Sequence, residues 1–275
     1  MKRNLNFSTI IRAAGFAKYL PLIIFQIKNW PEFMLHYAGV KNGGEEYVFR
    51  NGIRIKTNDA VSAATIAVIF IKKDYGDIPD NSVIIDIGAN IGVFSIFAAV
   101  PENNKVYSYE PMPENFNLLK ENIQSNNLGN KIFPFNSGVS SKKETRKLYL
   151  GDSPFHSFLP AKESPFNVLY GATKSPAQAF SQINCLSLKD IFDANSISVC
   201  HLLKMDCEGA EYEILYNAPD ECFKKIKEIR LEYHNHESSQ NNNGECLKNF
   251  LEKKGFTVKK FKKGSQYQGD LWMYR

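Results

Sequence analysis

Residues 83–92 read V-I-I-D-I-G-A-N-I-G and lead directly into an apolar stretch at residues 93–100. A short β-branched run that is followed by an acid and then by closely spaced glycines is typical of a buried parallel strand that turns sharply into a helix. Gly88 and Gly92 can adopt a positive φ close to a ligand, and Asn90 is one of the few other residues that tolerate that region. The amides at the start of the helix point at the same place, so the sequence predicts a ligand-binding turn.

The acid at the end of this strand indicates which ligand binds. Dinucleotides place a pyrophosphate over a G-x-G-x-x-G turn, whereas this turn reads D-x-G-x-N-x-G. A carboxylate at Asp86 would repel a pyrophosphate but attract the ammonium and sulfonium groups of S-adenosylmethionine. The next strand, residues 106–109, ends at Glu110, about where an acid binds two ribose hydroxyls. We therefore favour an S-adenosylmethionine site over the alternative of two solvated carboxylates beside a glycine turn.

The composition limits the class of protein. A length of 275 residues suits one large α/β domain with an extension, which we favour over two small domains. Hydrophobic residues at 43% and charged residues at 23% exclude disordered and fibrous chains. The net charge of +5 is too small to imply a nucleic-acid partner. Five cysteines without a C-x-x-C pair indicate neither a disulfide framework nor a zinc site, so we expect a cytoplasmic protein.

The first 31 residues form a basic, amphipathic arm. They contain no acid, many apolar residues and five basic ones, namely Lys2, Arg3, Arg12, Lys18 and Lys28. We favour helices that cap the domain, but the arm could also lie on an anionic membrane, at its inner face, or beside a lipid-linked substrate. The apolar run at residues 19–27 is too short to span a bilayer. We therefore divide the chain into an arm at residues 1–45 and a main domain at residues 46–275.

The main domain begins with a predicted β-hairpin at residues 47–57, because two alternating runs flank Asn51 and Gly52. From residue 83 onward strands alternate with helices, which predicts an α/β fold with a parallel sheet. The cofactor half covers residues 83–140, with Asn136 at the end of its third strand, near the adenine. A long aperiodic stretch at residues 151–180 could form a lid over the acceptor. Predicted strands are 83–87, 105–109, 131–136, 199–205, 226–233, 256–261 and 271–274, with two further short strands, one at 147–150 and one ending near Cys185. Predicted helices are 61–73, 92–100, 113–125, 187–193, 211–217 and 244–253.

Four stretches together resemble the FkbM-type family of S-adenosylmethionine-dependent methyltransferases. They are D-I-G-A-N-I-G at 86–92, Y-E-P at 109–111, N-S-G-V-S at 136–140 and L-L-K-M-D-C-E-G-A-E at 202–211. The resemblance implies a doubly wound, Rossmann-like sheet of seven strands with the last strand antiparallel. It also implies methylation, usually of an oxygen. Carried over by residue, Asp86, Gly88, Asn90 and Gly92 would hold the methionine part of the cofactor and Glu110 the ribose.

The predicted catalytic residues are Asp206, Glu232 and His234. Ligands of such sheets bind beyond the carboxyl ends of the strands, where Asp206 and Glu232 end two neighbouring strands. A hydroxyl acceptor must lose its proton, so these groups are candidate bases or metal ligands. Two facing carboxylates require a shared proton, a Mg²⁺ ion or a cationic neighbour such as His234. We favour the metal-free version with Asp206 or His234 as base. We expect Glu208 and Glu211 to stabilise the start of a helix.

Two other classes remain as alternatives to methyl transfer. A nucleotide-dependent oxidoreductase is disfavoured by the acid at position 86 and by the missing third glycine. A non-catalytic nucleotide-binding module is disfavoured because both Asp86 and Glu110 are present. The acceptor is a small molecule or a glycan: sugar hydroxyls, lipid-linked glycans and small natural products all fit the sequence equally well.

Overall fold

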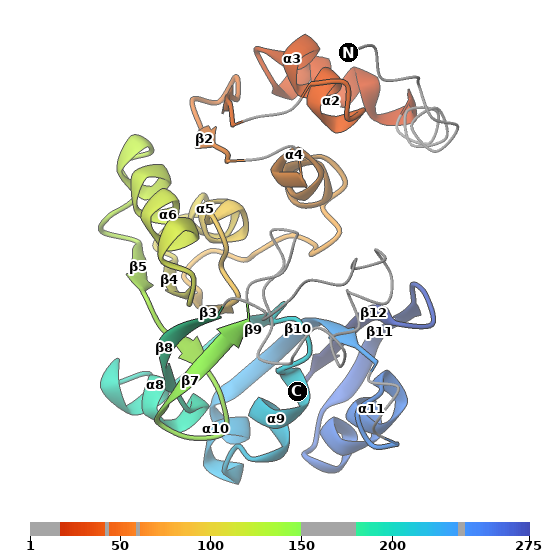
Figure 1. The fold of residues 1–275 in the computed structure, drawn as a ribbon. Helices are drawn as coiled ribbons and strands as arrows, with labels where there is room; N and C mark the ends of the chain where they lie inside the picture. Colours follow the sequence, from red (N-terminus) through yellow and green to blue (C-terminus); the bar gives the residue numbers. More distant parts are fainter. Residues whose placement is uncertain (1–16, 42–43, 59–60, 150–179, 236–239) are drawn as a thin grey trace.

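The computed structural model describes residues 17–41, 44–58, 61–149, 180–235 and 240–275, with a seven-stranded sheet at the centre (Figure 1). Neighbouring strands pair in parallel, except that β12 is antiparallel to both of its neighbours. The predicted α/β sheet with an antiparallel last strand is therefore confirmed. The strand order is β11 (Thr257–Lys263), β12 (Gln268–Tyr274), β10 (Ile226–His234), β9 (Cys200–Met205), β3 (Val83–Ile87), β4 (Lys105–Tyr109) and β5 (Ile132–Phe135).

Helices cover both faces of this sheet (Figure 1). One face carries α4 (Val61–Ile66), α5 (Val93–Ala99) and α6 (Pro113–Ser125), and the other carries α8 (Leu188–Ala194), α9 (Glu211–Tyr216), α10 (Asp220–Lys225) and α11 (Gly244–Lys253). Successive strand residues alternate between two cores, because a strand has a period of two. Ile84 and Leu202 belong to the core under α4, α5 and α6, whereas Ile85 and Leu203 belong to the other. The short α10 was not predicted, since six residues are too few to show a helical period.

The N-terminal elements are a short helix η1 (Ala17–Tyr19), α2 (Leu20–Gln26) and α3 (Trp30–Tyr37), followed by the predicted hairpin of β1 (Glu46–Val48) and β2 (Arg54–Lys56). The open edge of β2 docks on α6 through two asparagine side chains. Asn122 and Asn126 each accept a hydrogen bond from a β2 amide and donate one to a β2 carbonyl, at 2.6–3.0 Å. This pairing satisfies an edge that would otherwise be free to bind another strand.

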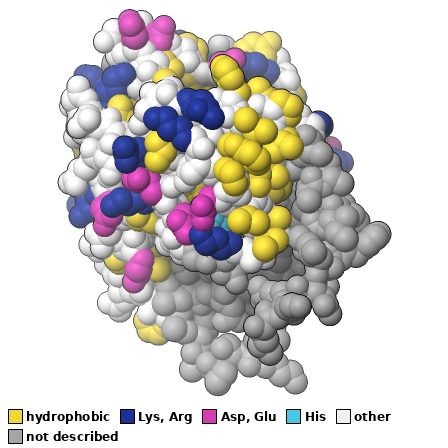
Figure 2. Space-filling view, turned by 90° about the horizontal axis from the view of Figure 1, so that it is seen from above, with side chains coloured by type: hydrophobic (Ala, Val, Ile, Leu, Met, Phe, Trp, Pro, Cys, Tyr) yellow, Lys and Arg dark blue, Asp and Glu magenta, His cyan; other side chains and the backbone are white. Residues whose placement is uncertain are grey.

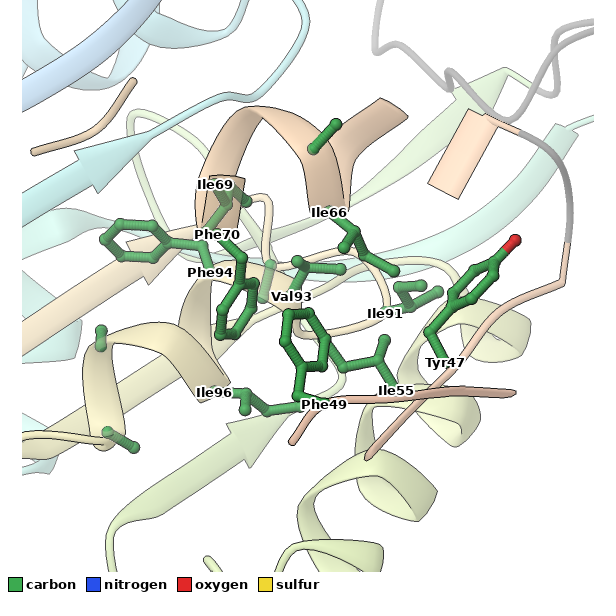
Figure 3. Packing of buried hydrophobic residues seen from close by; sticks show 14 of the residues in the cluster. Tyr47, Phe49, Ile55, Ile66, Ile69, Phe70, Ile91, Val93, Phe94 and Ile96 are labelled. Carbon is green, nitrogen blue, oxygen red and sulfur yellow. The ribbon is translucent and has the colours of Figure 1, made fainter. Parts of the chain in front are cut away.

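The hairpin also packs on the glycine turn. Phe49 and Ile55 point into a core shared with Phe70 of the following helical segment and with Ile91, Val93 and Ile96 of the turn and α5 (Figure 3). Tyr47 belongs to the same core, but its hydroxyl points away, to Nδ1 of His36 at 2.8 Å. The helix predicted at residues 61–73 is present as α4 and a following π-helical segment, η2 (Ala67–Ile71). The turn is therefore held from one side by a continuous apolar core.

A second, three-stranded sheet has the order β6 (Gly138–Val139), β8 (Phe180–Leu186) and β7 (Glu144–Tyr149). The sequence indicated strands near both ends of this region but not their union in a separate sheet. The predicted acceptor lid at residues 151–180 lies outside the described residues, except for Phe180, where β8 begins. Within the described part of the chain, every helix is too short or too polar to cross a bilayer.

Candidate active site

The glycine turn follows β3 at the carboxyl edge of the sheet. Gly88, Asn90 and Gly92 have φ values of 76°, 50° and 89°, so the positive φ that the sequence predicts is present. The turn passes so close to the end of β9 that a Cβ atom on Gly88 would lie 1.9 Å from the carbonyl oxygen of Asp206. Position 88 therefore requires glycine. The contact also holds the predicted cofactor turn against the segment that contains Asp206, one of the predicted catalytic residues.

Asp86 near the end of β3 has a fully buried carboxylate. Its Oδ1 lies 3.0 Å from Nζ of Lys204, and its Oδ2 accepts a 2.6 Å hydrogen bond from Oγ of Ser95. Lys204 also donates to the carbonyl of Gly88 at 2.9 Å. Burial opposes the charge on Lys204, but the carboxylates of Asp86 and Asp206 outweigh burial and raise its pKa. This ion pair ties β3 and β9 to the glycine turn, and the contact of Asp86 with the cofactor stays a prediction.

Lys204 was not among the predicted site residues, although the sequence carries a signal for it. The residue interrupts an apolar run that forms the central strand β9, and its side chain is 4% exposed. A lysine is almost never fully buried unless it is paired. The sequence thus signals that Lys204 has a buried partner, but naming Asp86 requires the strand order, because β3 and β9 lie far apart in the chain.

Glu110 follows β4 and is almost fully buried. Its Oε2 accepts a hydrogen bond from the backbone amide of Asn90 at 2.8 Å, and its Oε1 accepts one from Met112 at 2.9 Å. Burial raises the pKa of Glu110 to about 7, and the two amide hydrogen bonds oppose the rise. The side chain of Asn136 donates to the carbonyl of Glu110 at 2.9 Å. Each carboxylate oxygen keeps a second lone pair, so Glu110 has the capacity to bind the two ribose hydroxyls of S-adenosylmethionine.

The loop between β9 and α9 wraps around the carboxylate of Glu211. Glu211 is fully buried, and its Oε1 accepts hydrogen bonds from the amides of Cys207 at 3.2 Å and Gly209 at 3.3 Å. Glu208 and Gly209 have φ values of 56° and 101°, so the loop curls back over the start of its own helix. Glu211 thus satisfies two amides that precede α9, in keeping with the structural role expected for it.

His234, the last residue of β10, lies among carboxylates and is 1% exposed. Its Nδ1 is 3.0 Å from Oε1 of Glu211, while its Nε2 is 3.7 Å from Oε2 of Glu208 and 4.0 Å from Oε1 of Glu232. Burial favours the neutral imidazole, but the carboxylates of Glu211 and Glu208 outweigh burial and raise the pKa of His234 well above its usual value. The raised pKa favours the protonated, charged form of His234.

Asp206 and Glu232 belong to the same group of side chains, the acids around His234. The strands β9 and β10 are parallel neighbours, so the two acids lie at one edge of the sheet. The side chain of Glu232 is 27% exposed, and its Oε1 accepts a 2.7 Å hydrogen bond from Nε2 of Gln268. Burial and the negative charge of Asp206 raise the pKa of Glu232 to about 7. The structure thus brings together the three residues that the sequence predicts as catalytic.

A cation could also bind in this group. Asp206, Glu208 and His234 each offer one ligand atom, and the three atoms lie within 4.8 Å of one another. Carboxylate oxygens and an imidazole nitrogen are common ligands of divalent ions. The contact of Nδ1 with Glu211 is how metal-binding histidines are usually oriented. A cation and the proton on His234 would compete for the same nitrogen.

Tyr75 borders the group from the connection between η2 and β3. Its ring centroid is 5.3 Å from that of Phe94, and Nζ of Lys204 lies 6.0 Å from the Tyr75 ring. Burial and the negative charges of Asp206 and Glu232 raise the pKa of the Tyr75 hydroxyl well above its usual value. The sequence did not predict this neighbour, because Tyr75 stands in a stretch of turn-forming residues without a periodic pattern.

These features define a class of protein. A doubly wound sheet with an antiparallel last strand, a glycine turn after its first parallel strand and an acid after the next describe an S-adenosylmethionine-dependent methyltransferase. The sequence profile described as the Methyltransferase FkbM domain matches residues 86–258. The chain belongs to this family of methyltransferases, and the match favours methyl transfer over both alternatives that the sequence left.

Three relatives with methyltransferase names agree with this assignment. Methyltransferase sdnD of Sordaria araneosa is 28% identical over 181 residues, which cover 58% of this chain and 69% of that protein. The hexuronic acid methyltransferase AglP of Haloferax volcanii is 26% identical over 136 residues, which cover 50% of this chain and 49% of that protein. The 31-O-demethyl-FK506 methyltransferase FkbM of Streptomyces tacrolimicus is 25% identical over 195 residues, with coverages of 64% and 73%.

Proposed function

We propose that this enzyme methylates a hydroxyl group on a sugar or glycan, a lipid-linked glycan or a small natural product. The observation that carries the proposal is the state of Glu232, a partly exposed carboxylate 4.0 Å from the buried imidazole of His234, with a pKa raised to about 7. A general base works best when its pKa lies near the operating pH. The names of two relatives, with a hexuronic acid and a 31-O position as targets, support this class of acceptor.

The cofactor half of the site would hold S-adenosylmethionine, which supplies the methyl group on its sulfonium when bound. Glu110 has two free lone pairs for the ribose hydroxyls, and Asn136 holds the backbone beside it. The predicted contacts to the methionine part come from Asp86, Gly88, Asn90 and Gly92. Of these, Asp86 is itself paired with Lys204, so we expect it to act on the ligand through the turn that the pair supports.

The acceptor half would remove a proton. Asp206 and Glu232 would lie beside the acceptor hydroxyl in this proposal, and Glu232 would take its proton during methyl transfer, which leaves the demethylated cofactor as the other product. His234 remains charged and offsets the surrounding acids. We assign the base to a carboxylate rather than to His234, because a protonated imidazole cannot accept a proton.

A second version places Mg²⁺ between Asp206, Glu208 and His234, where it would orient the acceptor oxygen and lower its pKa. We favour the metal-free version, because a protonated His234 would place a positive charge among the acids at the same nitrogen that a metal ion would need. Assays with a chelator separate the two versions: a metal-dependent enzyme stops and then recovers when Mg²⁺ is added.

Mass spectrometry of glycans, lipids and small molecules from cells with and without the gene tests the proposed reaction. We expect one compound class to lose the mass of a CH₂ group when the protein is absent. Calorimetry provides the control on the purified chain. Tight binding of NAD without any response to S-adenosylmethionine or its demethylated product would contradict the proposed cofactor.

We further propose peripheral contact of residues 1–31 with an anionic membrane. The support for this location is the content of the segment, which has five basic residues and no acid. Each lysine or arginine near such a surface contributes about 1 kcal/mol of attraction.

A further inference from the structure

Helix α2, with the sequence L-P-L-I-I-F-Q, is apolar on every side. Its inner face packs in the core, where Ile23 and the following Ile27 are 0% exposed. Its outer face remains in solvent, with Leu22 43% and Phe25 75% exposed. A helix that is apolar all round is normally buried all round. We therefore expect the outer face of α2 to be covered by a binding partner.

The outer face is also hollowed and lies at one end of the molecule. Leu20, Pro21, Ile24, Phe25 and Arg50 line a shallow pocket on it. Figure 1 shows α2 and α3 at the opposite end from α9, α10 and α11, so this face projects away from the sheet. Figure 2, which views the molecule from that end, shows hydrophobic side chains gathered on one side with lysine and arginine side chains beside them.

Basic residues surround this apolar face. Nζ of Lys18 lies 4.9 Å and Nζ of Lys72 lies 6.0 Å from the ring of Tyr19, which immediately precedes α2. Arg50 donates from Nε to the carbonyl of Ile24 at 3.1 Å, which holds its side chain against the helix. Lys28 follows the helix and is exposed. The chain has no acid from residue 17 to residue 31.

We propose that the outer face of α2 docks on an anionic lipid bilayer, with Leu22 and Phe25 inserted among the lipids and the surrounding basic residues at the phosphates. This inference rests on the membrane contact proposed above for residues 1–31 and assigns that contact to one face. The charge pattern decides the occupant, since an apolar centre with a basic rim complements an anionic interface. A second copy of the chain fits less well. A stable interface buries about 800 Å² on each partner, more than a seven-residue helix offers, and it would bring two basic rims together.

Vesicle co-sedimentation of the full chain tests the apolar part of the proposal. The probes are vesicles of phosphatidylglycerol with phosphatidylcholine, and vesicles of phosphatidylcholine alone. We expect the wild type to bind only the anionic vesicles and the Leu22→Ser/Phe25→Ser variant to bind them about tenfold more weakly. The matched control is Val100→Ser/Val199→Ser, which removes exposed apolar side chains elsewhere and leaves binding unchanged. Unchanged thermal denaturation shows that both variants fold.

A charge reversal tests the basic rim. Lys18→Glu/Lys28→Glu should abolish binding to anionic vesicles, and high salt should release the wild type, because the attraction is screened within a Debye length. Lys253→Glu, at the far end of the molecule on α11, is the control. If the wild type binds no vesicle, the membrane contact itself fails. If it binds and the Leu22→Ser/Phe25→Ser variant binds equally well, only the assignment to α2 fails. A concentration-dependent dimer that this variant abolishes would overturn the proposal in favour of a second copy.

Discussion

Two groups of buried charges lie at the carboxyl ends of the central strands, and they are balanced in different ways. On the cofactor side, Asp86 has one cation, Lys204, at 3.0 Å, and a serine hydroxyl at 2.6 Å. On the acceptor side, a single imidazole, that of His234, lies within 4.0 Å of three carboxylates. In the first group, the one positive charge of Lys204 balances the one negative charge of Asp86. The second has an excess of acid, and burial together with the negative charge of Asp206 raises the pKa of Glu232 to about 7.

From this difference we expect the first group to have a structural role and the second group to take part in the chemistry. A matched pair in the interior has no proton to give or take near neutral pH, so it can hold the turn in place without reacting. An unmatched group must keep some acids protonated, and such groups with raised pKa values are typical of sites that move protons. We therefore expect substitutions in the two groups to act on different properties of the enzyme, namely stability in the first and turnover in the second.

The largest effect is expected from Lys204→Met. It leaves the carboxylate of Asp86 buried without its cation, which should lower the free energy of unfolding by about 3–5 kcal/mol. Denaturant titration measures the loss. In the double variant Lys204→Met/Asp86→Asn no unpaired charge remains, so more than half of the stability should return. A single variant as stable as the wild type would show that the pair does not support the turn.

Asp206→Asn should have the opposite pattern. It removes one negative charge from the crowded group, so stability should stay the same or rise, as is common when a strained active site is relaxed. Methyl transfer should fall at least about a hundredfold, whereas cofactor binding should be unchanged, because the side chain acts on the acceptor. Labelled methyl transfer into the acceptor measures turnover, and calorimetry measures binding. Transfer at the wild-type rate would place the chemistry elsewhere.

The sequence predicted the first group only in part and the second almost fully, for a physical reason. Asp86, Asp206 and Glu232 each end or follow a buried apolar run, which marks the carboxyl edge of a sheet without knowledge of the strand order. The partner of Asp86 depends on that order, because β3 pairs with β9, which lies more than a hundred residues later in the chain. The pairing of Lys204 with Asp86 therefore depends on the tertiary structure and could not be predicted from local sequence patterns.

The same limit explains what the sequence missed around the site. The hairpin at residues 47–57 was predicted from Asn51 and Gly52, but its docking on α6 depends on Asn122 and Asn126, which read as ordinary polar helix residues. Tyr75 reaches the acids from a segment with no periodicity. Long regular elements such as α6 were predicted to the residue, because the hydrophobic period and the proline and acid in the first turn are local signals.

Glu211→Gln tests how far the charge of His234 depends on one neighbour. The substitution keeps an acceptor for the amides of Cys207 and Gly209 but removes the carboxylate 3.0 Å from Nδ1. The pKa of His234 should fall by about 1–3 units, the usual effect of losing an adjacent opposite charge. NMR titration of labelled histidine measures this fall. Glu213→Gln is the matched control, since Glu213 lies on the same helix and pairs with Arg146 instead. An equal fall in both variants would contradict a direct role of Glu211.

The smallest effect concerns Glu110, which belongs to the cofactor side but has no dedicated cation. Its pKa is raised from the ordinary 4.5 to about 7, chiefly by burial. The ionised form is the better acceptor for ribose hydroxyls, so affinity for S-adenosylmethionine should rise about tenfold as the pH increases through about 7. Stability should change in the opposite direction. Because the folded chain holds this proton more tightly than the unfolded chain, the contribution of Glu110 to stability falls as the pH rises from 4.5 to about 7.

Calorimetry and denaturant titration over this pH range measure the two trends, and Glu110→Gln should flatten both of them. The variant cannot ionise, so its cofactor affinity should be low and constant, while its amide oxygen still accepts one hydrogen bond from the backbone. A pH profile of affinity that persists in Glu110→Gln would mean that another group controls cofactor binding.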